Sequence, residues 1–243
     1  MSTIAASHTA EAHGHSHEEA TGWKKYIWSL DHKIIGIQYL FTSLGFLLVG
    51  GALALLLRWQ LAYPSTQVMP NGDVGNPLSL PFINPQFYNA LFTMHATVMV
   101  FLVVMPLLIG AFGNYLIPLK IGTGDMAFPL INELSYWFFL ASGLIMLAGF
   151  FVAGGAAAGG WTSYAPLSTV AAYNGTKMGQ TLWAAGIFIN GLASIMGAFN
   201  YITTIVNMRA PGMTFFRLPL TVWALFITAF LLLLAVPVLS AAG

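Results

Sequence analysis

The chain has 243 residues, of which 58% are hydrophobic and only 6% are Asp, Glu, Lys or Arg, whereas a soluble globular domain carries roughly 25% charged residues. A mean hydropathy of +0.78 and a net charge of +1 exclude a water-soluble enzyme and a nucleic-acid-binding protein, which needs a basic surface. The absence of cysteine excludes disulfides, thiolate metal sites and a cysteine nucleophile. We therefore expect a protein embedded in a lipid bilayer.

The apolar residues form long unbroken runs that predict membrane-spanning helices. Backbone groups in hydrocarbon must be paired within a helix or a closed barrel, and a barrel strand would alternate in polarity over about ten residues. The runs instead approach the roughly 20 residues that a spanning helix needs. The sequence predicts an all-α, polytopic transmembrane helix bundle over residues 23–243, with five spans at about 35–57, 88–112, 134–157, 180–206 and 219–241.

The residues before the first span are polar and rich in histidine. Residues 1–22 lack an apolar core after a basic start, so they are not a cleaved signal peptide. Their four histidines would suit metal binding, but a composition of this kind is more often a mobile tail, and we expect a disordered cytoplasmic tail. The four are His8, His13, His15 and His17.

The few basic residues predict the orientation in the membrane. Arg58 and Lys177 fall on one side of the predicted spans, and the other six basic residues fall on the opposite side. Cytoplasmic segments carry the excess of Lys and Arg, so the N-terminus is predicted to be cytoplasmic. The six are Lys24, Lys25, Lys33, Lys120, Arg209 and Arg217.

One histidine, His95, lies inside a predicted span. A buried imidazole in lipid needs a strong partner, which is either a hydrogen-bond acceptor in the core or a metal such as haem iron. Both readings remain open from the residue pattern alone. No second histidine or carboxylate pair lies at helical spacing from His95, so the chain can offer one axial ligand at most.

Several polar groups stand at the edges of the spans or within them. Arg58 closes the first span, where it either extends to the interface or donates to a cofactor. Asp125 lies in a glycine-rich turn, and a cap or a solvated side chain is its simpler reading. Asn114, Asn132 and Asn200 bring amides toward the bundle interior, where they need hydrogen bonds, often through water. An acid at the mouth with amides behind it suits a proton-conducting file of water.

Five motifs in chain order resemble subunit I of the haem–copper oxidases, and among these most closely the aa3-type cytochrome c oxidase branch. The resemblance runs from about residue 23 to the end of the chain. That family has twelve spans, so the resemblance implies that this chain corresponds to the first five. The motifs are SLDHKIIGIQYL, MHATVMVF, FGNYLIPLKIGTGDMAFP, GGWTSYAPL and ASIMGAFNYITTIVNMRAPGMT.

The resemblance implies a haem site. His95 matches one axial ligand of the low-spin haem, expected to be haem A, whose second ligand comes from a later helix. Arg58 matches the arginine that hydrogen-bonds the haem formyl group. Trp161 and Tyr164 match a loop packed near the haem propionates.

It also implies a proton path. Asp125 matches the acid at the entrance of the D channel, and Asn114, Asn132 and Asn200 match its asparagine constriction. Two further positions match a tyrosine near the path and a serine that organises water, namely Tyr39 and Ser194.

Three positions depart from the family pattern. Ala193 stands where a second serine is common, and Glu133 stands where a second asparagine often follows Asn132. Both changes alter the polarity of the channel. Gln60 replaces a glutamate that binds a non-redox cation in many relatives, which puts that cation site in doubt.

The function that the resemblance implies is that of a proton-pumping terminal oxidase in the cytoplasmic membrane of a bacterium, with the mitochondrial inner membrane less favoured. Its high-spin haem, its copper and their ligands would lie on the remaining helices of subunit I. Expected partners are those helices, a copper-bearing subunit II, subunit III, cytochrome c and the lipid bilayer, with no nucleic acid. We expect no oxygen reduction by these 243 residues alone.

Three alternatives remain. A quinol oxidase of the same family would carry polar quinone-binding residues at four positions that are apolar here, Val49, Leu53, Phe87 and Ala90. A haem-binding membrane scaffold left by a split gene would keep a haem without a partner that supplies the copper ligands. A transporter that uses its Asn and Asp residues for substrate would bind no haem.

Overall fold

The structure, a computed structural model, describes residues 25–64, 75–170 and 178–242. The predicted tail at 1–22 lies outside the described residues. Five helices in the described part are long and apolar enough to cross a membrane, which confirms the predicted all-α bundle. They are α1 (His32–Ala62), the continuous run Pro85–Ile121, the run Pro129–Phe151, α6 (Met178–Asn207) and α7 (Leu220–Ala242).

Local sequence signals start and stop these helices. The Asp31 side chain accepts the Lys33 N–H at 2.8 Å at the start of α1, and the Asn84 side chain accepts the Phe87 N–H at 2.8 Å at the start of α2 (Pro85–Thr97). Such side chains satisfy N–H groups that the helix leaves free. Gly122 ends the second span in a left-handed conformation with φ of 77°, which glycine adopts without strain.

The second span is longer than predicted. After α2 it passes through two π-helical stretches, Val98–Val104 and Pro106–Ala111, and continues as α3 (Phe112–Ile121). The prediction ended this span near residue 112, which left Lys120 between the second and third spans. The helix runs on through Pro118, so Asn114 is a buried helical residue.

His32 explains how the helix tolerates Pro118. A proline has no N–H to donate to the carbonyl four residues earlier, which here belongs to Asn114. The Nδ1 of buried His32 lies 2.9 Å from that carbonyl oxygen and takes the place of the missing donor. His32 is the first residue of α1 and precedes the predicted first span, which begins at about residue 35.

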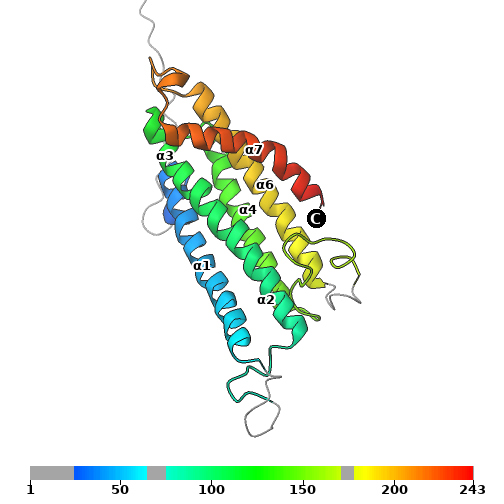
Figure 1. Ribbon diagram of the computed structural model, residues 1–243. Coiled ribbons are helices and arrows are strands. Elements are labelled where there is room, and N and C mark those ends of the chain that lie inside the picture. Colours follow the sequence, from blue (N-terminus) through cyan, green and yellow to red (C-terminus); the bar gives the residue numbers. More distant parts are fainter. Residues whose placement is uncertain (1–24, 65–74, 171–177, 243) are drawn as a thin grey trace, which may run out of the picture.

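The helices alternate in direction, and Figure 1 shows them as one elongated bundle. One end, here called the Asp125 end, holds residues 25–31, the turn 122–128 and the connection 208–219. The opposite end, here called the Trp161 end, holds residues 75–84 and 152–170. α4 (Pro129–Ala148) packs extensively on α6, and α7 lies across α6 and α3.

Candidate functional site

His95 is held so that one ring nitrogen stays free. It lies near the end of α2, half-buried, and its Nδ1 is 2.9 Å from the carbonyl oxygen of Gly50 on α1. A carbonyl oxygen only accepts, so Nδ1 carries the hydrogen and Nε2 of the neutral ring keeps its lone pair. No described residue hydrogen-bonds Nε2. A backbone acceptor behind one nitrogen, with the other nitrogen free, is how metal-binding imidazoles are oriented.

Two threonines tie the helix on both sides of His95. The Thr93 hydroxyl donates to Asn89 O and accepts the Gly160 N–H, both at 2.9 Å. The Thr97 hydroxyl donates to Thr93 O at 2.8 Å and accepts the Trp183 indole N–H at 2.9 Å. These bonds fix α2 to the loop 152–170 and to α6.

The other residues of the predicted haem site lie toward the Trp161 end. Arg58 is exposed on α1, eight residues after Gly50 and therefore about 12 Å further along the helix. Trp161 is 43% exposed with its ring 6.3 Å from that of Phe101, and Tyr164 is 76% exposed. The structure gives none of these three a polar contact with His95.

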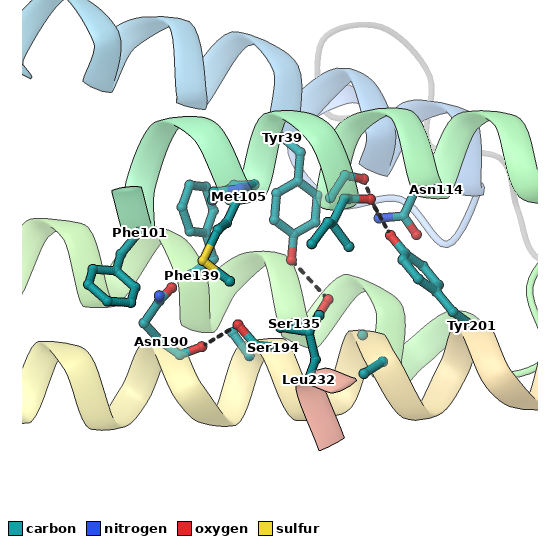
Figure 2. A pocket seen from close by; sticks show the side chains of 16 residues that line it. Tyr39, Phe101, Met105, Asn114, Ser135, Phe139, Asn190, Ser194, Tyr201 and Leu232 are labelled. Atoms are coloured by element: carbon teal, nitrogen blue, oxygen red, sulfur yellow. Dashed lines mark hydrogen bonds between the residues drawn. The ribbon is translucent and has the colours of Figure 1, made fainter. Parts of the chain in front are cut away.

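A separate cavity, lined mainly by apolar residues with six polar ones among them, lies between α1, the second span, α4, α6 and α7, and Figure 2 shows its lining. It offers about 50 Å³ to the centres of water molecules, and one water needs roughly 10–15 Å³ on this measure. The cavity therefore has room for several waters. Its polar lining comes from Tyr39, Asn114, Ser135, Asn190, Ser194 and Tyr201.

Three residues of the predicted proton path line this cavity. The Tyr39 hydroxyl is 3.0 Å from Ser135 Oγ, and Ser194 Oγ donates to Asn190 O at 3.0 Å. The Asn114 amide donates to Gly110 O at 2.7 Å, while its Oδ1 has no partner. Unpartnered buried acceptors of this kind are where internal water binds.

Asn132 and Asn200 do not line the cavity. Asn132 is fully buried on α4, and neither polar atom of its side chain has a hydrogen-bond partner. Asn200 instead holds the start of α4, because its Oδ1 accepts the Phe128 N–H at 2.9 Å and its amide donates to Phe128 O at 3.3 Å.

Asp125 is half-buried in the turn 122–128, at the Asp125 end of the bundle. Its Oδ1 accepts the Met126 N–H at 2.7 Å. Burial raises the pKa of the Asp125 carboxyl above its usual range, against the opposing effects of the Met126 N–H and of His32, and the charge of Asp31 raises the pKa further. A carboxyl group with a raised pKa can bind and release protons closer to neutral pH.

Within the described ranges no three His, Cys, Asp or Glu side chains gather as a metal site. That His95 supplies one ligand stays a prediction. The sequence did not identify Thr93, Thr97, Trp183, Ser135 or Asn190. Thr93 and Thr97 lie four residues apart on either side of His95, and this spacing was the signal that the sequence offered. Their hydrogen-bond donors, Gly160 and Trp183, belong to distant segments that the sequence alone does not connect to them.

Comparison with known proteins gives a consistent family match. Residues 34–243 match the family described as cytochrome c and quinol oxidase polypeptide I. The chain is 44% identical over 218 residues to a putative cytochrome c oxidase subunit 1-beta of Streptomyces coelicolor, covering 90% of this chain and 35% of that protein. It is 42% identical over 226 residues to cytochrome c oxidase subunit 1 of Thermostichus vulcanus, covering 93% of this chain and 37% of that protein. The chain thus spans about a third of the length of these relatives.

Proposed function

The chain belongs to the family of cytochrome c and quinol oxidase polypeptide I, and we propose that it forms the N-terminal part of the catalytic subunit of a respiratory cytochrome c oxidase. Such an enzyme reduces oxygen to water and pumps protons. The observation that carries the proposal is the His95 ring, whose Nδ1 is bound by Gly50 O at 2.9 Å and whose Nε2 is free.

In this proposal the free Nε2 of His95 would hold the iron of a low-spin haem, here haem A. A bound haem supplies an iron that takes up and passes on single electrons. The role of the chain is to fix the ligand, through Gly50 behind the ring and through the threonines on either side of it. Arg58 would donate to the formyl group of that haem, and Trp161 and Tyr164 would pack near its propionates.

The cavity between the helices, with its six polar lining residues, is the inner part of a proton path in this proposal. Asp125 takes protons from the cytoplasm. Asn114 and Asn132 form a constriction, and Tyr39 and Ser194 hold water beyond it. Asn200 contributes indirectly, because both polar atoms of its side chain are bonded to Phe128 and hold the start of α4. The unpartnered amide atoms of Asn114 and Asn132 support this role, because buried polar groups without protein partners are satisfied by water.

A cytochrome c donor is favoured over a quinol. The positions where a quinol oxidase of this family carries polar groups hold apolar residues, and Leu53 and Ala90 are only 8% and 2% exposed. Neither side chain can donate or accept a hydrogen bond with a quinone head group. We propose that the enzyme lies in a bacterial cytoplasmic membrane with the remaining helices of subunit I, a copper-bearing subunit II and subunit III, and that a high-spin haem and copper bind outside this chain.

The haem ligand is tested by spectra of the complete complex carrying His95→Ala. The low-spin haem band in the reduced-minus-oxidised spectrum is expected to disappear. His32→Ala is a matched control, because its ring also binds a backbone carbonyl through Nδ1 at 2.9 Å but lies at the Asp125 end, and it should keep the band. A normal low-spin band in His95→Ala would refute the ligand assignment.

A further inference from the structure

Ser240 on α7 carries a buried hydroxyl group that the proposed proton path does not use. The residue is 7% exposed, and within the described chain no group forms a hydrogen bond with its Oγ. A serine inside a helix commonly donates to the carbonyl one turn earlier, as Ser194 does to Asn190 O at 3.0 Å. Because Ser240 makes no such bond, its hydroxyl is available to a group outside its own helix.

The Ser240 hydroxyl faces α6, because Gly191 lets the two helices approach closely. A Cβ built on Gly191 would overlap the Ser240 hydroxyl and would lie 3.3 Å from Val236 Cγ1. The hydroxyl therefore occupies space that any larger residue at position 191 would fill. It points into the bundle and not into the lipid.

This hydroxyl lines a second cavity, here called the Ser240 cavity. It offers about 20 Å³ to the centres of water molecules, and one water needs roughly 10–15 Å³, so the cavity has room for one water. A buried water makes about two to four hydrogen bonds, and three polar side chains line this cavity. They are those of Asn190, Ser194 and Ser240, and the Ser194 hydroxyl can still accept a bond while it donates to Asn190 O.

The Ser240 cavity borders the larger cavity of Figure 2. Asn190 and Ser194 line both cavities, and so do Phe101 and Met105 on the opposite side. A hydroxyl or amide group can accept a bond from one water while it donates to another. Asn190 and Ser194 are therefore placed to connect water in the larger cavity to a water beside Ser240.

We propose that Ser240 holds a single internal water in the Ser240 cavity, and that this water extends the proton path from α6 to α7. The extension rests on the proposed function of the chain in an oxidase. Ser240 is a positioning residue that fixes the water, while Asn190 and Ser194 join it to the waters of the larger cavity. A proton moves along this row when one O–H bond breaks as another forms on the neighbouring oxygen, and no electron is transferred.

A purely structural role for Ser240 makes a different prediction. If the side chain serves only to fill the space against Gly191, the Ser240 cavity stays dry and Ser240→Ala changes no water. Ser43→Ala is the matched control. Ser43 is also buried on a spanning helix with an unpartnered Oγ in the described chain, but it lines neither cavity.

The first test is a structure of the complete oxidase at a resolution that shows ordered water, for the wild type and both variants. The wild type and Ser43→Ala should show one water within hydrogen-bond distance of Ser240 Oγ. Ser240→Ala should lose that water. A dry Ser240 cavity in the wild type, or the same water in Ser240→Ala, would overturn the proposal.

The second test is proton uptake by the same proteins in lipid vesicles. Ser240→Ala should slow uptake about twofold to tenfold, the range expected for the loss of one hydrogen bond between neutral groups, and Ser43→Ala should match the wild type. Wild-type uptake in a Ser240→Ala protein that lacks the water would refute the extension, and slowed uptake in Asp125→Asn would then leave the proposed function standing. Wild-type uptake in Asp125→Asn would instead contradict the proton path on which the extension rests.

Discussion

Two histidines of this chain form the same kind of hydrogen bond, and the bond has a different role in each case. Both donate from Nδ1 to a backbone carbonyl at 2.9 Å. The carbonyl that His32 binds lacks its helical donor because of Pro118, so that contact repairs a helix. The carbonyl of Gly50 orients the His95 ring and leaves Nε2 available. Sequence alone identifies His95 from its place in an apolar run, but the bond that fixes its tautomer is a contact between distant segments.

Asp125 leads to a prediction about pH and stability. Burial raises the pKa of its carboxyl in the folded state, so the folded protein binds that proton more tightly than the unfolded chain does. The resulting stabilisation is present at low pH and is lost as the pH rises through the folded pKa. Asn at this position keeps the acceptor for the Met126 N–H but never ionises.

We therefore expect Asp125→Asn to gain stability relative to wild type as the pH increases from about 4. The measurement is the melting temperature of both proteins in detergent at a series of pH values. Parallel curves would show that the carboxyl group of Asp125 is not linked to folding.

At the scale of elements, the bond between Thr97 and Trp183 joins the second span to α6. Trp183 is 5% exposed and Thr97 is 0% exposed. Thr97→Val leaves the indole N–H buried and unpaired, at a cost of about 1–3 kcal/mol. Trp183→Phe removes that donor, so in its background Thr97→Val should cost less.

A double-mutant cycle measures this link directly. Unfolding free energies of the two single variants and the double variant should give a coupling energy of about 1 kcal/mol. Additive effects would mean that the bond contributes nothing to holding the His95 helix.

The existence of the five helices could be predicted, but one boundary could not. Apolar runs identify spanning helices because hydrocarbon leaves the backbone no other partner. The second span continues to Ile121 because a side chain from α1 compensates for Pro118, and local sequence does not contain that contact. The same reason explains why Ser135 and Asn190 were missed as lining residues of the cavity.

For the whole molecule, the distribution of basic residues predicts that the Asp125 end faces the cytoplasm. These 243 residues contain no cysteine, so single cysteines can report the side. Gly124 and Thr162 are exposed in turns at opposite ends, and a side chain at Gly124 would meet no atom within 4 Å.

A membrane-impermeant maleimide on intact cells should label Thr162→Cys at once. Gly124→Cys should react after the cells are opened. The reverse pattern would invert the topology and remove Asp125 from the cytoplasmic side.

The chain covers about a third of the length of its curated relatives. The proposed part of this chain in an oxidase therefore rests on three features of its own residues. They are the His95 imidazole with its free Nε2, the cavity between the helices, and the half-buried Asp125 carboxyl in the turn 122–128. The most direct test of this account is the reduced-minus-oxidised spectrum of the purified wild-type complex. The account predicts the band of a low-spin, bis-histidine haem of the formyl-bearing type. A complex that contains this chain in full amount and shows no low-spin haem band would contradict it.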